Sequence, residues 1–282
     1  MKQVCLYASE LSIITRHNRY ENISKIIYKI WEKNFNDDLK NLEKLLLDQN
    51  VSISKIENND ECIERITKSY NIDLKDHINT CLKTKDVQSL SDNQENIIKK
   101  CQNMNHDDLS KLKSSIISKT NTNFGTRFEG NSIEIYQQKF NTQVNLTTKF
   151  FKKKIGSSNN IDWFMGGKID GITNDKILIE VKNRTKKLFY NLRDYEKVQV
   201  MVYLKILDLK KAHLVESLKN NKEEMNIIEI DFDADFWKQE ILKKIVLFIN
   251  FFDIFINDID LRIKFLKNSE FIDDLYEKYL FN

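Results

Sequence analysis

Apolar and polar positions alternate differently in the first and second halves of the chain. Apolar side chains in residues 9–34 recur every three to four positions, which predicts helices that bury one face. Residues 38–118 keep a helical pattern but are more polar, and two segments there open on paired aspartates, as a helix N-terminus favours. The expected inner faces of the first helices carry Ile13, Ile14, Ile23, Ile26, Ile27, Ile30 and Trp31.

The pattern changes near residue 121. A helix is expected over residues 124–140, and it is followed by strand signals within residues 143–153, 162–173 and 176–182. A helical segment at 191–207 separates these from two further strands at 211–218 and 226–232. A long apolar helix then begins near Asp235, and an amphipathic helix ends the chain. This order predicts an α/β fold with a mixed central sheet flanked by helices.

Composition narrows the class of protein only moderately. The 282 residues suit one large domain or a core with a smaller helical addition. A net charge of +3 neither demands nor excludes nucleic acid as a partner, so only local clusters can decide. Because proline is absent, glycine, asparagine and aspartate must form the turns.

Two further features bear on the environment of the chain. The four cysteines, which are scattered without a CxxC pair, favour reduced thiols in an intracellular protein and argue against a zinc or iron–sulfur site. The apolar run at 245–256 contains Asn250 and Asp253 and is shorter than the roughly 18 residues that cross a bilayer. We therefore expect a core helix there, no signal peptide and no membrane partner. The cysteines are Cys5, Cys62, Cys81 and Cys101.

Residues 166–184, GGKIDGITNDKILIEVKNR, combine an apolar strand with charged groups. Residues two apart in a strand point to the same face, so Glu180 and Lys182 project together. A tight turn at Thr-Asn-Asp would bring Asp170, at the end of the preceding strand, beside Glu180. The glycines at 166, 167 and 171 would leave room for a bulky group against the backbone. The opposite face, toward the core, is expected to carry Ile177, Ile179 and Val181.

Two converging carboxylates are unfavourable unless a cation lies between them. Mg²⁺ suits oxygen ligands, keeps several waters and bridges to phosphate, while Lys182 could orient a water molecule for attack on phosphorus. The alternative is an exposed salt-bridged pair at a strand end, because the E-x-K spacing alone is a weak signal. D-x-K occurs elsewhere at 38/40, 73/75 and 208/210, but none of these follows an apolar strand with a glycine-flanked aspartate.

Supporting residues have two interpretations each. Glu129, on the preceding helix, is either a third carboxylate near the metal or a solvated helix charge. Gln199 and Tyr203 share one helix face, so Gln199 is either a buried hydrogen-bonded group or a site residue. The basic residues after the strand either hold phosphates or form a solvated turn; they are Arg184, Lys186 and Lys187.

The order of these motifs resembles the PD-(D/E)xK nuclease superfamily. Glu129 is followed by KIDG, then ILIEVK, then VQVMVY, and the pattern is most similar to the phage-lambda-exonuclease and YqaJ-type recombinase branch. Residues 6–33 and 124–140 also resemble that branch, so the likeness covers about 6–33 and 124–240. One departure is Ile169, which stands where the family has proline before the aspartate.

The resemblance implies a restriction-endonuclease-like fold and a role for each matched residue. Asp170, Glu180 and the Val181 carbonyl would bind Mg²⁺, with Mn²⁺ able to substitute, and Lys182 would position the water. Glu129 would assist a second metal, and Gln199 would order the site. The resemblance also implies that Ser9 and Arg127 contact DNA phosphate. The other residues expected to contact DNA do not come from the resemblance; they are Arg184, Lys186, Lys187 and Tyr203.

The expected organisation has four parts: an N-terminal helical segment at 1–35, a helical insertion at 36–120, the nuclease core at 121–240 and C-terminal helices at 241–282. The insertion has no counterpart in the family and would clamp DNA, bind a partner or buttress the core.

The function so implied is a metal-dependent DNA exonuclease that degrades duplex ends in recombination, repair or viral DNA processing by two-metal hydrolysis. Its partners would be duplex DNA with free ends, a single-strand annealing protein and further copies of itself. The alternatives are a structure-specific endonuclease on the same core, a non-catalytic DNA-binding protein with a degenerate nuclease fold, and an interaction protein whose charged hairpin is only surface.

Overall fold

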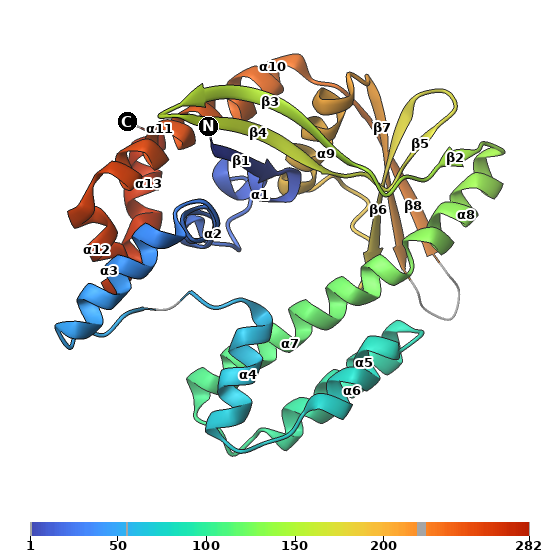
Figure 1. Cartoon of the computed structure of the whole chain (residues 1–282). Coiled ribbons are helices and arrows are strands. Elements are labelled where there is room, and N and C mark those ends of the chain that lie inside the picture. Colours follow the sequence, from blue (N-terminus) through green and yellow to red (C-terminus); the bar gives the residue numbers. More distant parts are fainter. Residues whose placement is uncertain (1, 55, 219–223, 282) are drawn as a thin grey trace.

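The computed structural model describes residues 2–54, 56–218 and 224–281, which form a mixed α/β fold with helices around two sheets (Figure 1). One sheet has the order β1-β4-β3, and the other has the order β2-β5-β6-β7-β8. The predicted mixed sheet with flanking helices is thus confirmed. The strands are β1 (Lys2–Tyr7), β2 (Val144–Asn145), β3 (Phe150–Ser158), β4 (Ile161–Lys168), β5 (Gly171–Thr173), β6 (Ile177–Arg184), β7 (Lys211–Leu218) and β8 (Glu224–Asp231).

The chain passes from the first sheet to the second between β4 and β5. Only Ile169 and Asp170 separate these two strands, so Asp170 lies at the junction of the sheets. β5 then pairs antiparallel with β6, placing Gly171 opposite Ile179. At the turn, the Lys176 backbone has φ 63° and its N–H donates to the Thr173 carbonyl at 3.0 Å. This is the hairpin that the sequence predicts.

Both faces of β6 are covered. On one face, Leu178 belongs to the main apolar core together with residues of α9 (Asp194–Leu207) and α1 (Ala8–Ile14). On the other, Ile179 and Val181 pack in a smaller cluster with residues of α8 (Glu129–Phe140). The expectation that Ile179 and Val181 face a core is confirmed, and the face of Glu180 is buried as well.

Four helices between the first helices and the sheets have a core of their own: α4 (Asn59–Ser69), α5 (Lys75–Lys83), α6 (Val87–Lys100) and α7 (His106–Arg127). We call them the helical unit. The side chains of Asn58, Asp86 and Asn105 cap three of these helices by accepting bonds from first-turn N–H groups. Figure 1 shows the unit on one side of the molecule, with the long α7 leading from it to α8 and the end of the larger sheet.

The helices at the two ends of the chain pack into the main core. α2 (Ile23–Asn34) and α3 (Asn36–Asp48) join it, and α3 contributes Leu39, Leu42 and Leu46, so α3 belongs to the main core and not to the core of the helices that follow it in sequence. After β8 come α10 (Ala234–Phe236), a π-helical turn η1 (Trp237–Leu242), α11 (Lys243–Asn257), α12 (Ile259–Lys267) and α13 (Phe271–Phe281).

The expected core helix at 245–256 lies within α11, where Phe248, Phe252 and Phe255 are fully buried. Within the described part of the chain, none of the helices has both the length and the apolar character needed to cross a membrane. All four cysteines are free thiols, in agreement with the prediction.

Two features of the fold, the first strand and the residues used in turns, go beyond what the sequence predicts. β1 is a strand that pairs parallel with β4, although only helices were expected near the N-terminus. The turns use asparagine heavily: five of the nine non-glycine residues with positive φ are asparagines, and no glycine in the described ranges has positive φ. Asparagine tolerates this left-handed region better than most residues, which fits a chain without proline.

Candidate functional site

The hairpin places Asp170 against the backbone of β6. Its Oδ2 accepts a hydrogen bond from the Val181 N–H at 2.7 Å, next to Glu180. In an extended strand the N–H and C=O of one residue point to the same edge, so the Val181 carbonyl faces the edge where Asp170 lies. The predicted convergence of Asp170 with Glu180 is therefore present in the structure.

Glu180 and Lys182 project toward α9, as their spacing predicts. The Lys182 Nζ donates to Glu180 Oε1 at 2.8 Å and to Gln199 Oε1 at 3.0 Å. Gln199 in turn donates from Nε2 to the Tyr203 hydroxyl at 3.4 Å. The structure thus joins two residues of β6 to two of α9 in one chain of contacts, with the ammonium fixed between a carboxylate and an amide.

The electrostatics of this group are unbalanced. Burial raises the pKa of Asp170 well above its usual range, and the nearby charge of Glu180 raises it further. Burial alone would lower the pKa of Lys182, but the charge of Glu180 and its hydrogen bond outweigh burial and raise it. Glu180 is only 3% exposed, and its Oε2 accepts no hydrogen bond from any described residue. A buried carboxylate oxygen without a partner is unfavourable, so the site favours an additional cation or donor.

Glu129 lies close to the same charges, at the first turn of α8. It is half-buried; burial raises its pKa, a hydrogen bond with Thr126 opposes that rise, and the charge of Glu180 adds to it. Three carboxylates, those of Asp170, Glu180 and Glu129, therefore face a single ammonium, that of Lys182.

Asn183 is a residue of this region that the sequence did not single out. It is on the opposite face of β6, where its amide donates to the Gly125 carbonyl at 2.7 Å and its Oδ1 accepts from the Ser132 hydroxyl at 2.8 Å. These bonds tie β6 to the last turn of α7 and to α8. Asn183 thereby fixes the helix start on which Glu129 lies. An amide next to the E-x-K pair was the only signal, and its partners are too distant in sequence to infer.

The donor set fits a hard divalent cation only with help from other oxygens. In the described ranges, no group of three or more His, Cys, Asp or Glu side chains is arranged to hold a metal ion. Asp170 and Glu180 would therefore bind such an ion together with the Val181 carbonyl, water and substrate oxygens. This is the coordination that Mg²⁺ accepts, since it binds through one or two carboxylates and keeps several waters.

Two residues expected to contact DNA are engaged by other parts of the protein instead. The Arg184 guanidinium donates to Glu196 Oε1 at 2.7 Å and to Glu216 Oε1 at 2.6 Å, so it belongs to an internal ion cluster and not to a solvated basic turn. Tyr203 is 5% exposed, and its ring packs against the backbone of Gly167, where an added Cβ would lie 2.7 Å from the ring. Glycine at 167 leaves room for this ring, and the ring faces the protein interior rather than a surface.

The remaining expected contacts are spread over the surface. Ser9 is exposed at the start of α1, and Lys186 and Lys187 are exposed after β6. Arg127 binds the end of α5: its guanidinium donates to the carbonyls of Leu82 and Thr84, the latter at 3.0 Å. Arg127 therefore caps a helix C-terminus inside the helical unit, an arrangement that stabilises the free carbonyls there.

Comparisons with known proteins give no family assignment. No protein-family model matches the chain, and no curated protein matches it. Among solved structures, the chain is similar to an alkaline exonuclease (LHK-Exo) from Laribacter hongkongensis, with 14% identity and a TM-score of 0.39 over 67% of this chain and 89% of that one.

The chain is also similar to a structure of LHK-Exo in complex with dAMP, at 12% identity and a TM-score of 0.36 over 68% of this chain and 90% of that one. The protein SSO0001 is similar at 15% identity and a TM-score of 0.35, over 67% and 84% of the two chains. These TM-scores are too low to assign a family, so function is inferred below from the site.

Proposed function

We propose that the chain is a metal-dependent DNA nuclease that hydrolyses phosphodiesters, acting as an exonuclease on duplex ends. The observation on which this depends is the buried group of Asp170, Glu180 and Lys182 at the junction of the sheets. Its excess negative charge and the unpartnered Glu180 Oε2 are better explained by a cation-binding site than by a structural ion pair.

Each residue of the group has a chemical role in this proposal. Mg²⁺, with Mn²⁺ as a substitute, would supply Lewis-acid stabilisation of the phosphoryl oxygens and a water of lowered pKa. Asp170 and Glu180 hold the ion, and the Val181 N–H fixes the orientation of Asp170. Glu129 would bind a second ion or its waters.

In this proposal Lys182 acts on the reacting water and phosphate, and Gln199 holds Lys182 in position. The Lys182 ammonium, fixed by Glu180 and Gln199, offers its remaining N–H donor to the attacking water or to a phosphoryl oxygen. Attack of that water on phosphorus forms one P–O bond and breaks the ester bond to the leaving oxygen; the water gives up a proton to solvent, and the leaving oxygen takes one up from solvent. Fixed donors of this kind stabilise the charge that develops in the transition state.

An assay with three DNA substrates tests the proposal. Purified protein is incubated with end-labelled linear duplex, covalently closed circular duplex and single-stranded DNA, with Mg²⁺ or with EDTA. We expect nucleotides from the linear duplex with Mg²⁺ and an intact circle. The Glu180→Gln variant should lose at least a hundredfold in rate, since it weakens metal binding. Glu134→Gln, the same change at an exposed position of α8, is the matched control.

The outcomes separate the alternatives. Cleavage of the circle would identify an endonuclease on the same core. Binding of DNA without cleavage under any metal would indicate a non-catalytic DNA-binding protein. If the Glu180→Gln variant cleaves as fast as the wild type, the assigned site is wrong even if nuclease activity is present.

A further inference from the structure

An open groove lies where the helical unit meets the chain that follows β6. Its walls are α6 and α7, which pack beside each other in the helical unit (Figure 1), and Thr185 and Lys186 also line it. The volume of the groove is about 440 Å³, which is within the range of pockets that hold compact ligands. We call this the α6–α7 groove.

Helical periodicity explains why the groove residues lie together. Those of α6 recur every three to four positions from Val87 to Ile98, and those of α7 recur every four positions from Lys113 to Asn121, so each helix presents one face. Gln94 joins the two faces, because its Nε2 donates to Asn121 Oδ1 at 3.0 Å. The walls are therefore held in a set arrangement, which reduces the entropy lost when a ligand binds.

The floor of the groove is aliphatic and partly open to solvent. Ile98 and Ile117 are half-buried and do not belong to the core of the helical unit, whereas Leu90 is buried in that core. Apolar side chains exposed together and surrounded by charged groups are typical of a surface that binds a ligand or another protein. None of the described residues that line the groove is aromatic, so it lacks the rings on which the bases of an unpaired strand stack.

The rim of the groove is basic. Lys99, Lys113 and Lys186 line it and are exposed, whereas Glu95 is the one acidic side chain among its described lining residues. None of the three lysines has a carboxylate partner within the ranges that the structure describes. A surface of this charge favours a ligand that carries carboxylates.

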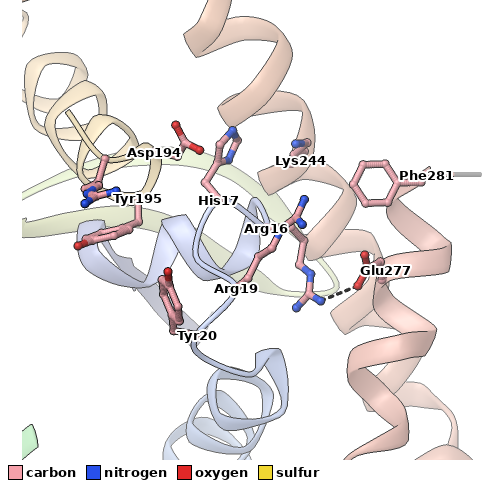
Figure 2. A pocket seen from close by; sticks show the side chains of 10 residues that line it. Arg16, His17, Arg19, Tyr20, Asp194, Tyr195, Lys244, Glu277 and Phe281 are labelled. Atoms are coloured by element: carbon pink, nitrogen blue, oxygen red, sulfur yellow. Dashed lines mark hydrogen bonds and ion pairs between the residues drawn. The ribbon is translucent and has the colours of Figure 1, made fainter. Parts of the chain in front are cut away.

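Two cations of another cavity, in contrast, are paired within the protein. Figure 2 shows Arg16 there, joined to Glu277 of α13 at 2.6 Å by the ion pair drawn as a dashed line. Lys244 of the same cavity lies 2.7 Å from Glu240. The lysines of the α6–α7 groove are not neutralised in this way, so their ammonium groups are available to carboxylates of another molecule.

The lysines lie at both ends of the aliphatic floor. Lys113 and Asn121 are eight residues apart on α7, so the groove extends about 12 Å along this helix. Lys113 lies at one end. At the other end, the Gly125 carbonyl accepts a hydrogen bond from Asn183 of β6, which brings Lys186 to the C-terminal part of α7. An extended peptide of about four residues spans this length.

We propose that the α6–α7 groove binds a segment of a partner protein in which acidic residues flank a short apolar stretch. The carboxylates pair with the lysines at the two ends, and the apolar side chains cover Ile98 and Ile117. Such a segment contacts both the helical unit and the chain after β6, so it holds these two parts together. The inference does not rest on the nuclease proposal, because the groove residues lie outside the group of Asp170, Glu180 and Lys182.

Selection of peptides tests the chemistry of the occupant. A random dodecapeptide library displayed on phage is selected against the full chain, and a labelled synthetic peptide of the enriched sequence is titrated by fluorescence anisotropy. We expect sequences in which Asp or Glu flank Leu, Ile or Phe, and an affinity that falls as salt is added. Failure to enrich such sequences, or enrichment of basic ones, would overturn the proposal.

Substitutions on α7 then locate the binding site. Lys113→Glu should weaken binding of the selected peptide roughly tenfold and reduce its salt dependence. Lys111→Glu, the same reversal at an exposed position outside the groove, is the matched control. Ile117→Asp, which places a carboxylate on the aliphatic floor, should weaken binding at least roughly tenfold, whereas Ser114→Asp should bind like the wild type.

The result for Lys113→Glu stands by itself, because this side chain is exposed and its replacement leaves the core of the helical unit intact. If Lys113→Glu binds the selected peptide within twofold of the wild type, the assignment of the groove is wrong.

Other occupants would give different results. If a short duplex in EDTA displaces the peptide, and Lys186→Glu weakens duplex binding with a salt slope lowered by about one, the groove contacts nucleic acid and the peptide assignment is overturned. If sedimentation shows an assembly of the chain that Ile117→Asp dissociates, the occupant is a second copy, and the assignment to a partner protein is overturned. Peptide binding by a chain that cleaves no DNA supports the groove and leaves only the nuclease proposal without support.

Discussion

Two buried ion clusters occupy the same face of β6, two residues apart, and differ in how completely they are satisfied. In the first, Glu180 and Lys182 pair beside Asp170, and Glu180 Oε2 has no partner in the described part of the chain. In the second, which we call the Arg184 cluster, Arg184 bridges Glu196 and Glu216. Glu216 also accepts from the Tyr190 N–H at 2.9 Å and from Asn226 at 3.0 Å.

Opposite pKa shifts reflect this difference. Asp170 is half-buried and Glu216 is fully buried, and burial is the largest influence on the pKa of each. For Asp170, Glu180 adds to burial and the pKa rises well above the usual range. For Glu216, hydrogen bonds from Asn226 and Arg184 outweigh burial and the pKa falls. A cluster that satisfies its own charges stabilises the fold, whereas one that does not is suited to bind something else.

The largest expected effect is on catalysis, at Lys182. In Lys182→Gln, a neutral donor still reaches Glu180, but the ammonium that orients the water is lost. We expect the rate of DNA cleavage to fall by roughly 10² to 10⁴, measured on linear duplex with Mg²⁺. Lys139→Ala, an exposed lysine on α8, should keep full activity. A rate within tenfold of wild type would show that the two clusters do not differ in the way proposed.

Substitution in the Arg184 cluster should lower the stability of the fold, whereas substitution of Lys182 should lower the rate of cleavage. Arg184→Met leaves two buried carboxylates without their cation, which should lower the free energy of unfolding by about 3–5 kcal/mol. The three tryptophans all lie in the main core, so their fluorescence in urea reports its unfolding. Arg65→Met, which removes an exposed ion pair, should change stability by less than about 1 kcal/mol.

A compensating variant sharpens this result. Combining Arg184→Met with Glu196→Gln and Glu216→Gln removes the uncompensated charges and should recover most of the lost stability. If Arg184→Met costs less than about 1 kcal/mol, the Arg184 cluster is not structural, and its guanidinium becomes a candidate for substrate contact again.

Metal binding should stabilise only the unsatisfied cluster. At a Mg²⁺ concentration 100-fold above its Kd, the wild type should gain about 2.7 kcal/mol, seen as a higher Tm. Asp170→Asn removes one ligand and a charge that burial disfavours, so its Tm without metal should equal or exceed that of the wild type and should not rise with Mg²⁺. An equal rise in both proteins would place the ion elsewhere.

The smallest effect concerns a neutral buried pair on the other face of the sheet. The Tyr136 hydroxyl contacts His213 Nδ1 at 2.7 Å, and burial lowers the pKa of His213. As the pH is lowered, His213 is therefore protonated in the unfolded chain before it is protonated in the folded chain. The stability contributed by neutral His213 is complete above about pH 6.5 and falls as the pH is lowered toward the folded pKa.

His213→Asn keeps a polar partner for Tyr136 and should remove this dependence. The difference in slope between wild type and variant is at most about 1.4 kcal/mol per pH unit below pH 6.5, measured by urea unfolding. Identical slopes would show that His213 is already protonated in the fold or that it titrates normally.

The sequence predicts local features of the site well and distant pairings poorly. The hairpin and the shared face of Glu180 and Lys182 follow from strand periodicity and a short turn, so they were accessible. The ion pairs of Arg184 could not be predicted from the sequence, because its partners Glu196 and Glu216 lie 12 and 32 residues away. The same holds for β1, whose partner strand β4 begins at Ile161.

Helix α3 illustrates a different limit. Its amphipathic sequence resembles that of the helices after it, and only the burial of Leu39, Leu42 and Leu46 shows which core it joins. An amphipathic pattern predicts that a face is buried but not against what, so the composition of a segment cannot decide between two neighbouring cores.

Helix α7 has a mechanical consequence. Its 22 residues make a rod about 33 Å long, and the Gly125 carbonyl in its last turn accepts a hydrogen bond from Asn183. A single residue, Phe128, separates the end of α7 at Arg127 from Glu129, the first residue of α8. Adding a single alanine midway along it would turn everything beyond by about 100° and advance it by about 1.5 Å. Such an insertion would change either the orientation of the helical unit or the direction in which the Glu129 side chain points. The length of α7 is therefore fixed by the contacts at both of its ends.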